Sequence, residues 1–331
     1  MDKLVSVVIV NWNGEKYLKK CLASLMETNY QNVEIIVIDN GSTDNSIKII
    51  KEFFDNGVKL VENKNIGYAG GANKGINVSK GEYVLIANPD IIFTKDYLGD
   101  LVQVLEKSAE NGACIGKLIK YDFDNDKVLN VIDSAGISLN HKRQGYDRGQ
   151  NEVDSGQYDE DKRVFGVCGA AALFKRKALE DIKFVNEYFD EDFFAYKEDI
   201  DICWRLNLYG YKCLYVHDAI AYHGRGMNSS KGIIKTIKNR RNQSEFLKGI
   251  SFRNHYLMIS KNEVEYTYRK DKIGIYVDAM KYIVFFLLFD FKCLKYIKEY
   301  KKLKPRILEK RSVVMNNIRI SQEEIYSLFD L

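Results

Sequence analysis

The first 120 residues alternate between two hydrophobic periods, and this alternation limits the possible folds more than any other feature of the chain. Four short apolar runs have the length and the β-branched content of strands buried on both faces: Val5–Val10, Val33–Ile38, Val58–Val61 and Tyr83–Ala87. Between them, apolar residues recur every three or four positions, as amphipathic helices require. Strands that alternate with helices of this length predict a parallel, doubly wound α/β sheet.

Beyond Gly116 the pattern loosens. Residues 121–163 are polar and predict loops with a few irregular strands, whereas order returns at Val164–Phe174 and in a helical segment that opens near Glu198. From Ile233 onward the pattern favours helices, some of them amphipathic. We therefore expect an α/β domain over residues 1–226 and a mostly helical, basic region over residues 227–331.

The charge of the chain is uneven, although its net value is only +4. The segment Lys292–Arg311 holds nine basic residues against two acidic ones. This excess favours an anionic surface as a partner, and an amphipathic helix over Ile273–Phe291 fits either attachment to a membrane surface or packing on the catalytic domain. No recognised nucleic-acid-binding module is present.

Targeting signals and cysteine spacing add little to the prediction of function. The amino terminus has no signal-peptide pattern, and the longest strongly apolar stretch, Tyr282–Phe289, is too short for a bilayer, which takes about 20 residues. The six cysteines have no CxxC spacing, and most lie in apolar runs. We expect them to be reduced and buried.

Polar residues follow each of the four predicted strands. In a parallel sheet, ligands bind beyond the carboxyl ends of the strands, so these residues are expected to share one rim. In chain order they are Asn11, Asp39, the Asn- and Gly-rich stretch that includes Asn65, Gly67 and Asn73, and the triplet Asn88-Pro89-Asp90.

Two of these aspartates have both a structural and a functional interpretation. Asp39 fits a turn that caps the next helix, but beside Asn11 it also fits an acceptor for a nucleobase N–H. Asp90 fits a simple Asn-Pro-Asp turn. However, Pro89 fixes the chain direction there, and an aimed carboxylate suits Mg²⁺ or Mn²⁺ together with a substrate phosphate.

Glu198, Asp199 and Asp201 form an acidic cluster at a predicted helix start. Carboxylates there are stabilised by the helix dipole, which is the structural interpretation. The functional interpretation is that one of them removes a proton from an attacking hydroxyl group.

As a set, these motifs resemble the family-2 glycosyltransferases of the GT-A (Rossmann-like) fold, and in particular a rhamnosyltransferase-like branch of bacterial surface-polysaccharide assembly. The resemblance extends from Val5 to about Gly226. It implies transfer of a sugar, with inversion, from a dTDP- or UDP-sugar to a saccharide or lipid-linked acceptor. It also implies a location in the cytoplasm, peripheral at the inner face of the cell membrane.

The same resemblance implies roles for individual residues. Asp199 would be the base, with Glu198 or Asp201 shaping the acceptor site. Asp90 would bind the metal ion, with His223 as a second ligand or a diphosphate contact, and Gly169 would lie in a small-residue loop against the donor sugar. The family pattern usually has Asp where this chain has Asn88, which places more of the metal affinity on Asp90.

Two other functions remain compatible with this pattern. A nucleotidyltransferase also combines a doubly wound sheet with an Asp-bound metal, but it needs a glycine- and lysine-rich loop that Asn11–Lys16 does not supply. A non-catalytic nucleotide-sugar-binding or scaffold protein would explain Asn88. Intact Asp90, Asp199 and His223 argue against that alternative.

Overall fold

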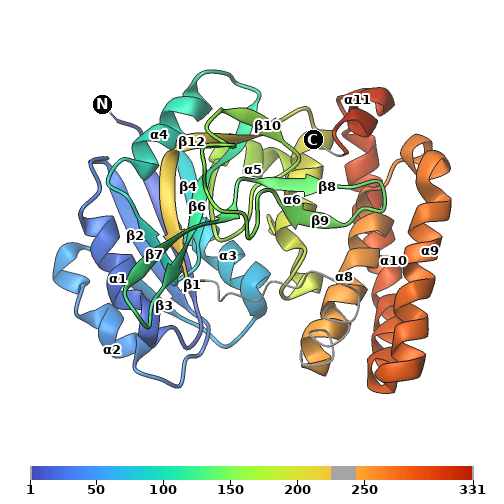
Figure 1. The fold of residues 1–331 in the computed structure, drawn as a ribbon, viewed down its shortest axis with the longest axis horizontal. Coiled ribbons are helices and arrows are strands. Elements are labelled where there is room, and N and C mark those ends of the chain that lie inside the picture. Colours follow the sequence, from blue (N-terminus) through green and yellow to red (C-terminus); the bar gives the residue numbers. More distant parts are fainter. Residues whose placement is uncertain (1, 225–243, 330–331) are drawn as a thin grey trace.

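The computed structural model describes residues 2–224 and 244–329. Its centre is a curled sheet in which the order β3-β2-β1-β4 forms a parallel half (Figure 1). These strands are β1 (Val5–Asn11), β2 (Val33–Asp39), β3 (Lys59–Glu62) and β4 (Tyr83–Ala87). The predicted α/β fold is confirmed, and the predicted strands lie within one residue of the observed ones.

Helices connect the parallel strands, as the apolar spacing predicts. They are α1 (Glu15–Met26), α2 (Ser46–Lys51) with the short η1 (Phe54–Asn56), α3 (Gly67–Val78) and α4 (Tyr97–Glu106). In α1 the apolar side chains Leu18, Leu22 and Leu25 are buried, so one face of the helix packs on the sheet. Burial of this face stabilises the helix more than its intrinsic propensity does.

The other half of the sheet is mixed. An antiparallel strand, β11 (Ala171–Lys175), lies between β4 and β6 (Asn111–Asp122), and β12 (Lys212–His223) then pairs parallel with β6. Two apolar runs, Cys213–Val216 and Ile220–Tyr222, form the single strand β12, whose register shifts between Val216 and Ile220. Shorter strands complete the region: β5 (Ile91–Phe93), β7 (Lys127–Ser134) and β10 (Lys162–Val164) in the same sheet, and the separate hairpin of β8 (Ile137–Leu139) and β9 (Gly145–Asp147).

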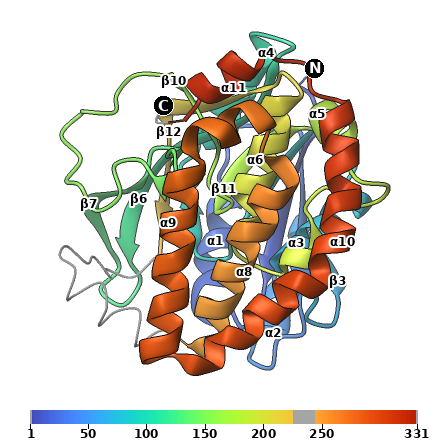
Figure 2. The same ribbon diagram turned by 90° about the vertical axis from the view of Figure 1, so that its right-hand side faces the viewer.

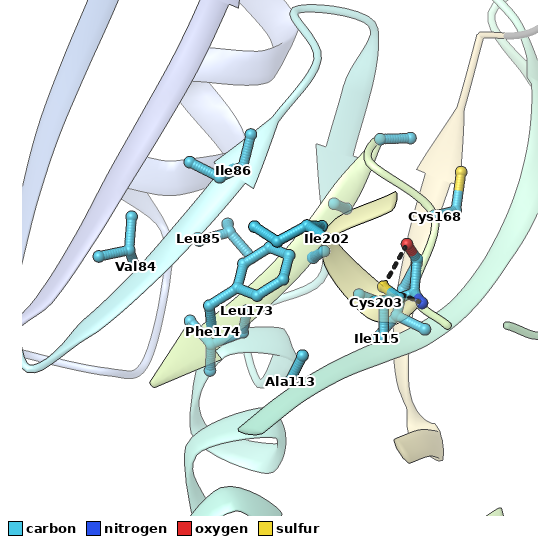
Figure 3. Packing of buried hydrophobic residues seen from close by; sticks show 14 of the residues in the cluster. Val84, Leu85, Ile86, Ala113, Ile115, Cys168, Leu173, Phe174, Ile202 and Cys203 are labelled. Carbon is cyan, nitrogen blue, oxygen red and sulfur yellow. Dashed lines mark hydrogen bonds between the residues drawn. The ribbon is translucent and has the colours of Figure 1, made fainter. Parts of the chain in front are cut away.

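The core joins the sheet to helix α6 (Glu198–Leu208), with α5 (Arg176–Ile182) and η2 (Glu191–Phe193) beside it. Figure 3 shows Ile202 of α6 among the apolar side chains of β11, including Leu173 and Phe174. Cys203 lies in the same layer, where the Val167 N–H donates to its sulfur at 3.3 Å. All six cysteines are free and buried, as expected. The core therefore fixes the direction of α6, which begins with the acidic cluster.

The carboxyl-terminal helices lie side by side at one end of the molecule (Figures 1 and 2). They are α8 (Glu245–Asn262), α9 (Glu265–Phe289), η3 (Phe291–Leu294), α10 (Lys295–Asn316) and α11 (Gln322–Ser327). The expected domain boundary at residues 226 and 227 lies outside the described residues, as does the start of the helices expected from Ile233. In the described ranges no helix has the length and apolar content needed to cross a membrane.

Candidate active site

The carboxyl ends of β1 and β2 bring Asn11 and Asp39 together. They are paired in the parallel register, and Asn11 Nδ2 donates to Asp39 Oδ1 at 2.8 Å. The other carboxylate oxygen of Asp39 accepts from the Ser42 N–H at 2.9 Å and the Gly41 N–H at 3.2 Å. Both oxygens of Asp39 thus hold the turn that leads toward α2. This geometry agrees with the turn interpretation, and recognition of a nucleobase stays a prediction.

A cavity of about 820 Å³ lies beyond these strand ends, between the sheet, the start of α6 and the first turns of α8. Its volume is that of a small-molecule site. Six of the predicted site residues line it: Asn65, Gly67, Asn88, Gly169, Glu198 and Asp199.

Gly67 begins α3 in a conformation and a contact that only glycine tolerates. Its φ is +77°, and a Cβ atom there would lie 2.3 Å from the carbonyl oxygen of Phe194. The close approach places the start of α3 against the segment that precedes α6. For Asn73, farther along α3, the structure gives fold-stabilising contacts, and a contact with the donor stays a prediction. Its buried amide donates to Phe189 O and accepts from the N–H groups of Tyr188 and Phe189, so it ties α3 to a loop instead of lining the cavity.

Glu198 and Asp199 stand at the cavity wall, where the charge of the neighbouring Lys197 offsets only part of the effect of burial on their pKa values. Asp199 accepts from the Ile200 N–H at 2.8 Å and the Gly169 N–H at 3.4 Å. Glu198 is 7% exposed, and its Oε2 has no hydrogen-bond partner in the described ranges. Burial, and then the charge of Asp199, raise the pKa of Glu198 to about 8, and burial also raises the pKa of Asp199. Glu198 is therefore protonated at neutral pH.

The predicted role of Asp201 in shaping an acceptor site also stays a prediction, because its contacts are those of the fold. Asp201 is fully buried and does not line the cavity. It binds Arg205 at 3.1 Å on its own helix and Lys261 at 2.9 Å on α8. Arg205 in turn donates to the carbonyl oxygens of Ile182 and Tyr188. Asp201 lies two positions past Asp199, so it faces the interior and joins α6 to the carboxyl-terminal helices.

Asp90, in the turn before β5, and His223, at the end of β12, come together although they are far apart in the sequence. His223 Nε2 lies 3.4 Å from Asp90 Oδ1, and His223 Nδ1 lies 2.7 Å from Asp133 Oδ2. Burial opposes a charge on this ring, but the hydrogen bonds to Asp133 and Asp90 outweigh it and raise the pKa of His223 to about 9. A buried carboxylate behind an imidazole fixes its orientation, as it does behind metal-binding histidines.

The described residues contain no group of three or more His, Cys, Asp and Glu side chains able to hold a metal ion. Asp90 nevertheless offers an oxygen atom and His223, once its ring has lost a proton, a nitrogen atom at the same point, with the ring oriented by Asp133. This pair fits a divalent ion whose remaining ligands come from a substrate diphosphate or water.

Several residues of the cavity have no role in the sequence-based prediction. They lie on the loop before α6, on β9 and on α8: Lys197, Tyr146, Asp147, Ser244, Phe246 and Leu247. Burial lowers the pKa of Lys197. Lys197 directly precedes the acidic motif, which was a usable signal. The residues of α8 had none, because only the packing of α8 on α6 brings them to the site.

Two family descriptions match the chain. The model of glycosyl transferase family 2 matches residues 6–183, more than half of the sequence, and that of glycosyl transferase family group 2 matches residues 151–245. The chain belongs to glycosyl transferase family 2. The family expected from the strand-end motifs is confirmed, and the rhamnosyltransferase-like branch within it stays a prediction.

Family-2 relatives match this chain over part of their length. Glycosyltransferase GlyG of Streptococcus pneumoniae is 42% identical over 126 residues, which are 37% of this chain and 41% of GlyG. Poly-beta-1,6-N-acetyl-D-glucosamine synthase of Staphylococcus epidermidis is 28% identical over 221 residues, which are 66% of this chain and 49% of the synthase. The matched region therefore spans less than half of either relative.

A solved structure has a similar fold over nearly the whole chain. The mannosyltransferase PcManGT from Pyrobaculum calidifontis, solved in complex with GDP-Man and Mn²⁺, has a TM-score of 0.54 and 15% identity. The comparison covers 99% of this chain and 84% of the mannosyltransferase. At this identity the likeness supports the GT-A fold.

Proposed function

We propose that this family-2 chain is a glycosyltransferase that moves a sugar from a nucleoside-diphosphate donor to an acceptor hydroxyl group. The observation that carries the proposal is the cavity at the strand ends, whose wall holds the buried Glu198 and Asp199 with no cationic partner at hydrogen-bond distance among residues 2–224 and 244–329. A structural role does not explain this arrangement, because buried structural carboxylates are normally paired.

In the proposed reaction Asp199 is the base. The acceptor oxygen forms a bond to the anomeric carbon while the bond from that carbon to the diphosphate oxygen breaks. The acceptor proton passes to Asp199, and the nucleoside diphosphate leaves with the bonding electrons. Glu198 is the poorer candidate for the base, because its raised pKa leaves it protonated at neutral pH. We propose that Glu198 donates a hydrogen bond to the acceptor, and that the reaction inverts the anomeric centre.

On the donor side we propose that Asn65, Gly67, Asn88 and Gly169 contact the sugar nucleotide, since all four line the cavity. Asn11 and Asp39 lie next to it and are proposed to face the nucleobase. Asp90 and His223 would hold Mg²⁺ or Mn²⁺. The metal ion would neutralise negative charge on the departing diphosphate.

The donor sugar and the acceptor are finer parts of this proposal. We propose a dTDP- or UDP-sugar, with rhamnose as the first sugar to test, and an acceptor in surface-polysaccharide or glycolipid assembly. The basis is the motif resemblance, together with similarity to a relative that is a polysaccharide synthase. A screen of nucleotide sugars for hydrolysis and transfer, with Mg²⁺ or Mn²⁺, tests the activity. Wild-type protein that cleaves none of them would refute it.

The metal site has its own test within that screen. Asp90→Ala should weaken nucleoside-diphosphate binding measured by calorimetry in Mn²⁺, because it removes the carboxylate oxygen of the pair. His223→Ala should show a smaller loss if the imidazole only contacts the diphosphate. Unchanged affinity and unchanged metal dependence in Asp90→Ala would contradict the metal role of Asp90.

We also propose that α9 attaches the protein peripherally to an anionic membrane. Its exposed side carries a stripe of apolar residues spaced three and four positions apart: Ile273, Val277, Met280, Val284 and Leu287. The charges around the stripe have one sign. Lys272 and Lys281 are exposed, whereas Asp271 binds Arg143 and Asp278 accepts from Gln144. An apolar stripe with exposed lysines suits anionic headgroups.

Sedimentation with vesicles tests this attachment. Wild-type protein should bind anionic vesicles at low salt and leave them as the salt concentration rises. Replacing Val284 and Leu287 with glutamate should abolish binding, whereas Val153→Glu, at an exposed apolar position outside this stripe, should not. Deleting residues 273–331 is a poorer test, because Lys310 of α10 binds Asp190 in the interior. Equal binding by all three proteins would show that the stripe does not contact the membrane.

A further inference from the structure

The segment that leads into the acidic motif has an unusual backbone. Residues 193–197, here called the pre-helical segment, end directly before Glu198. Three of them, Phe194, Tyr196 and Lys197, have φ values of 65°, 70° and 76° although none is glycine. Side chains other than glycine rarely adopt this region, and such residues persist only where their surroundings hold them. The start of α6 therefore depends on an external support.

Asn254 of α8 supplies that support. Its side chain is fully buried, and its amide nitrogen faces three backbone carbonyl groups of the pre-helical segment. Asn254 Nδ2 lies 2.8 Å from Phe193 O, 2.8 Å from Ala195 O and 2.9 Å from Tyr196 O. One amide group thus contacts three carbonyl groups within four residues, so it constrains the path of the chain through the strained positions.

Arg253 fixes the orientation of this amide. Arg253 Nε donates to Asn254 Oδ1 at 3.0 Å, while Arg253 Nη2 donates to the carbonyl oxygen of Asp192 at 3.1 Å. The guanidinium group has no acceptor atoms, so the oxygen of Asn254 must point toward it and the nitrogen toward the carbonyl groups. The two neighbours on α8 act as one support for the pre-helical segment.

The opposite side of the segment contacts α3. The Ala69 N–H donates to Phe194 O at 3.2 Å, and Gly67 leaves no room for a Cβ atom at the same carbonyl group. The pre-helical segment is therefore held between α3 on the donor side and α8 on the other side. Gly67 on the α3 side and Ile250 on the α8 side both line the same cavity.

We propose that Asn254 is a positioning residue for the Glu198–Asp199 pair, and that α8 thereby helps to fix the geometry of the active site. This rests on the proposed glycosyl transfer. Asn254 does not touch the substrate. It holds the backbone from which Asp199 projects, so its loss displaces the proposed base relative to the acceptor hydroxyl group. A shift of about 1 Å at such a group is enough to cost about 10²-fold in rate.

The test is Asn254→Asp, which keeps the size of the side chain and replaces the donor nitrogen with an acceptor oxygen facing three carbonyl oxygens. Asn254→Ala is the milder variant. The matched control is Ser260→Ala on the same helix, which removes only the 2.9 Å hydrogen bond between Ser260 and Tyr300. Each variant is compared with wild type for turnover, donor binding by calorimetry, thermal unfolding and amide exchange of residues 193–200.

We expect Asn254→Asp to lower turnover at least about 10²-fold and Asn254→Ala less, with donor affinity within about threefold of wild type. Faster amide exchange should be confined to residues 193–200, and the control should match wild type. Unchanged turnover or unchanged exchange would overturn the proposal. Loss of folding and donor binding in both variants would also overturn it, since Asn254 would then stabilise the whole chain. Inactive wild-type protein would instead refute the proposed function. The amide exchange of the Asn254 variants would still test whether Asn254 holds the pre-helical segment.

Discussion

The first turn of α6 holds three carboxylates whose environments differ sharply. Asp201 is fully buried, and Arg205, Lys261 and Asn262 bind it. Glu198 and Asp199, three and two positions earlier, face the cavity, and within the described part of the chain Asp199 accepts hydrogen bonds from backbone N–H groups alone. Carboxylates at the same helix start therefore have two different roles.

This difference distinguishes carboxylates that stabilise the fold from carboxylates that can take part in a reaction. A buried charge with good partners joins elements of the fold, and removing one partner is costly. A buried carboxyl group without a cationic partner has a raised pKa and is a candidate for proton transfer. The predictions that follow test this division, from the largest expected effect to the smallest.

The largest effect is expected for Asp199→Asn. The amide cannot accept the acceptor proton, and loss of a general base costs about 10² to 10⁴ in rate. Donor affinity should change little, which calorimetry with the nucleoside diphosphate measures. Glu198→Gln is the neighbouring comparison. A larger loss in Glu198→Gln would move the base by one residue, and near-normal turnover in both would reduce the motif to a charged helix start.

Lys261→Met should have its effect on stability. Lys261 is fully buried between Asp190 and Asp201, so the variant leaves both acids with fewer cationic partners. Breaking such a buried pair costs about 3–5 kcal/mol in the free energy of unfolding, which urea denaturation measures. The control is Arg269→Met on α9, whose ion pair with Glu265 is 73% and 71% exposed and should contribute at most about 1 kcal/mol. Equal losses of stability in the two variants would contradict the distinction between the buried and the exposed ion pair.

Glu198→Gln should also change the pH dependence of stability. The pKa of Glu198 is raised to about 8 in the folded chain, above its ordinary value of 4.5. Folding thus favours the protonated form, and stability is lost as the pH rises between these two values. The glutamine variant lacks this loss, so it should be more stable than wild type above pH 8 by on the order of a few kcal/mol. Parallel melting-temperature profiles from pH 5 to 9 would contradict the raised pKa.

The smallest effect is expected for Asp39→Ala. Its carboxylate has several partners, as that of Asp201 does, yet it lies beside the cavity. We expect pyrimidine nucleotide binding to weaken about tenfold, the typical effect of losing a hydrogen bond to a charged group, while circular dichroism shows an intact fold. If uridine and thymidine diphosphates bind as well as before, Asp39 belongs with Asp201 among the structural carboxylates.

Local hydrophobic patterns were enough to predict the parallel half of the sheet. The apolar runs of β1 and β4 are buried on both faces, as is most of β2, so period and length identified them without knowledge of their partners. The strand-end rule then located Asn65, Gly67 and Asn88 at the cavity. Asn73 does not line the cavity, because the face of a helix that meets a loop depends on where the loop lies.

The sequence alone determined the α/β sheet, the family motifs and the acidic start of α6, because each is written in residues that are close along the chain. Only the tertiary structure decided which carboxylates are paired and which are not. Asp201 meets Lys261 and the pre-helical segment meets Asn254 across about 60 positions, through the packing of α8 on α6. The physical reason is that charge compensation depends on distances in space, and residue spacing along the chain does not specify these distances.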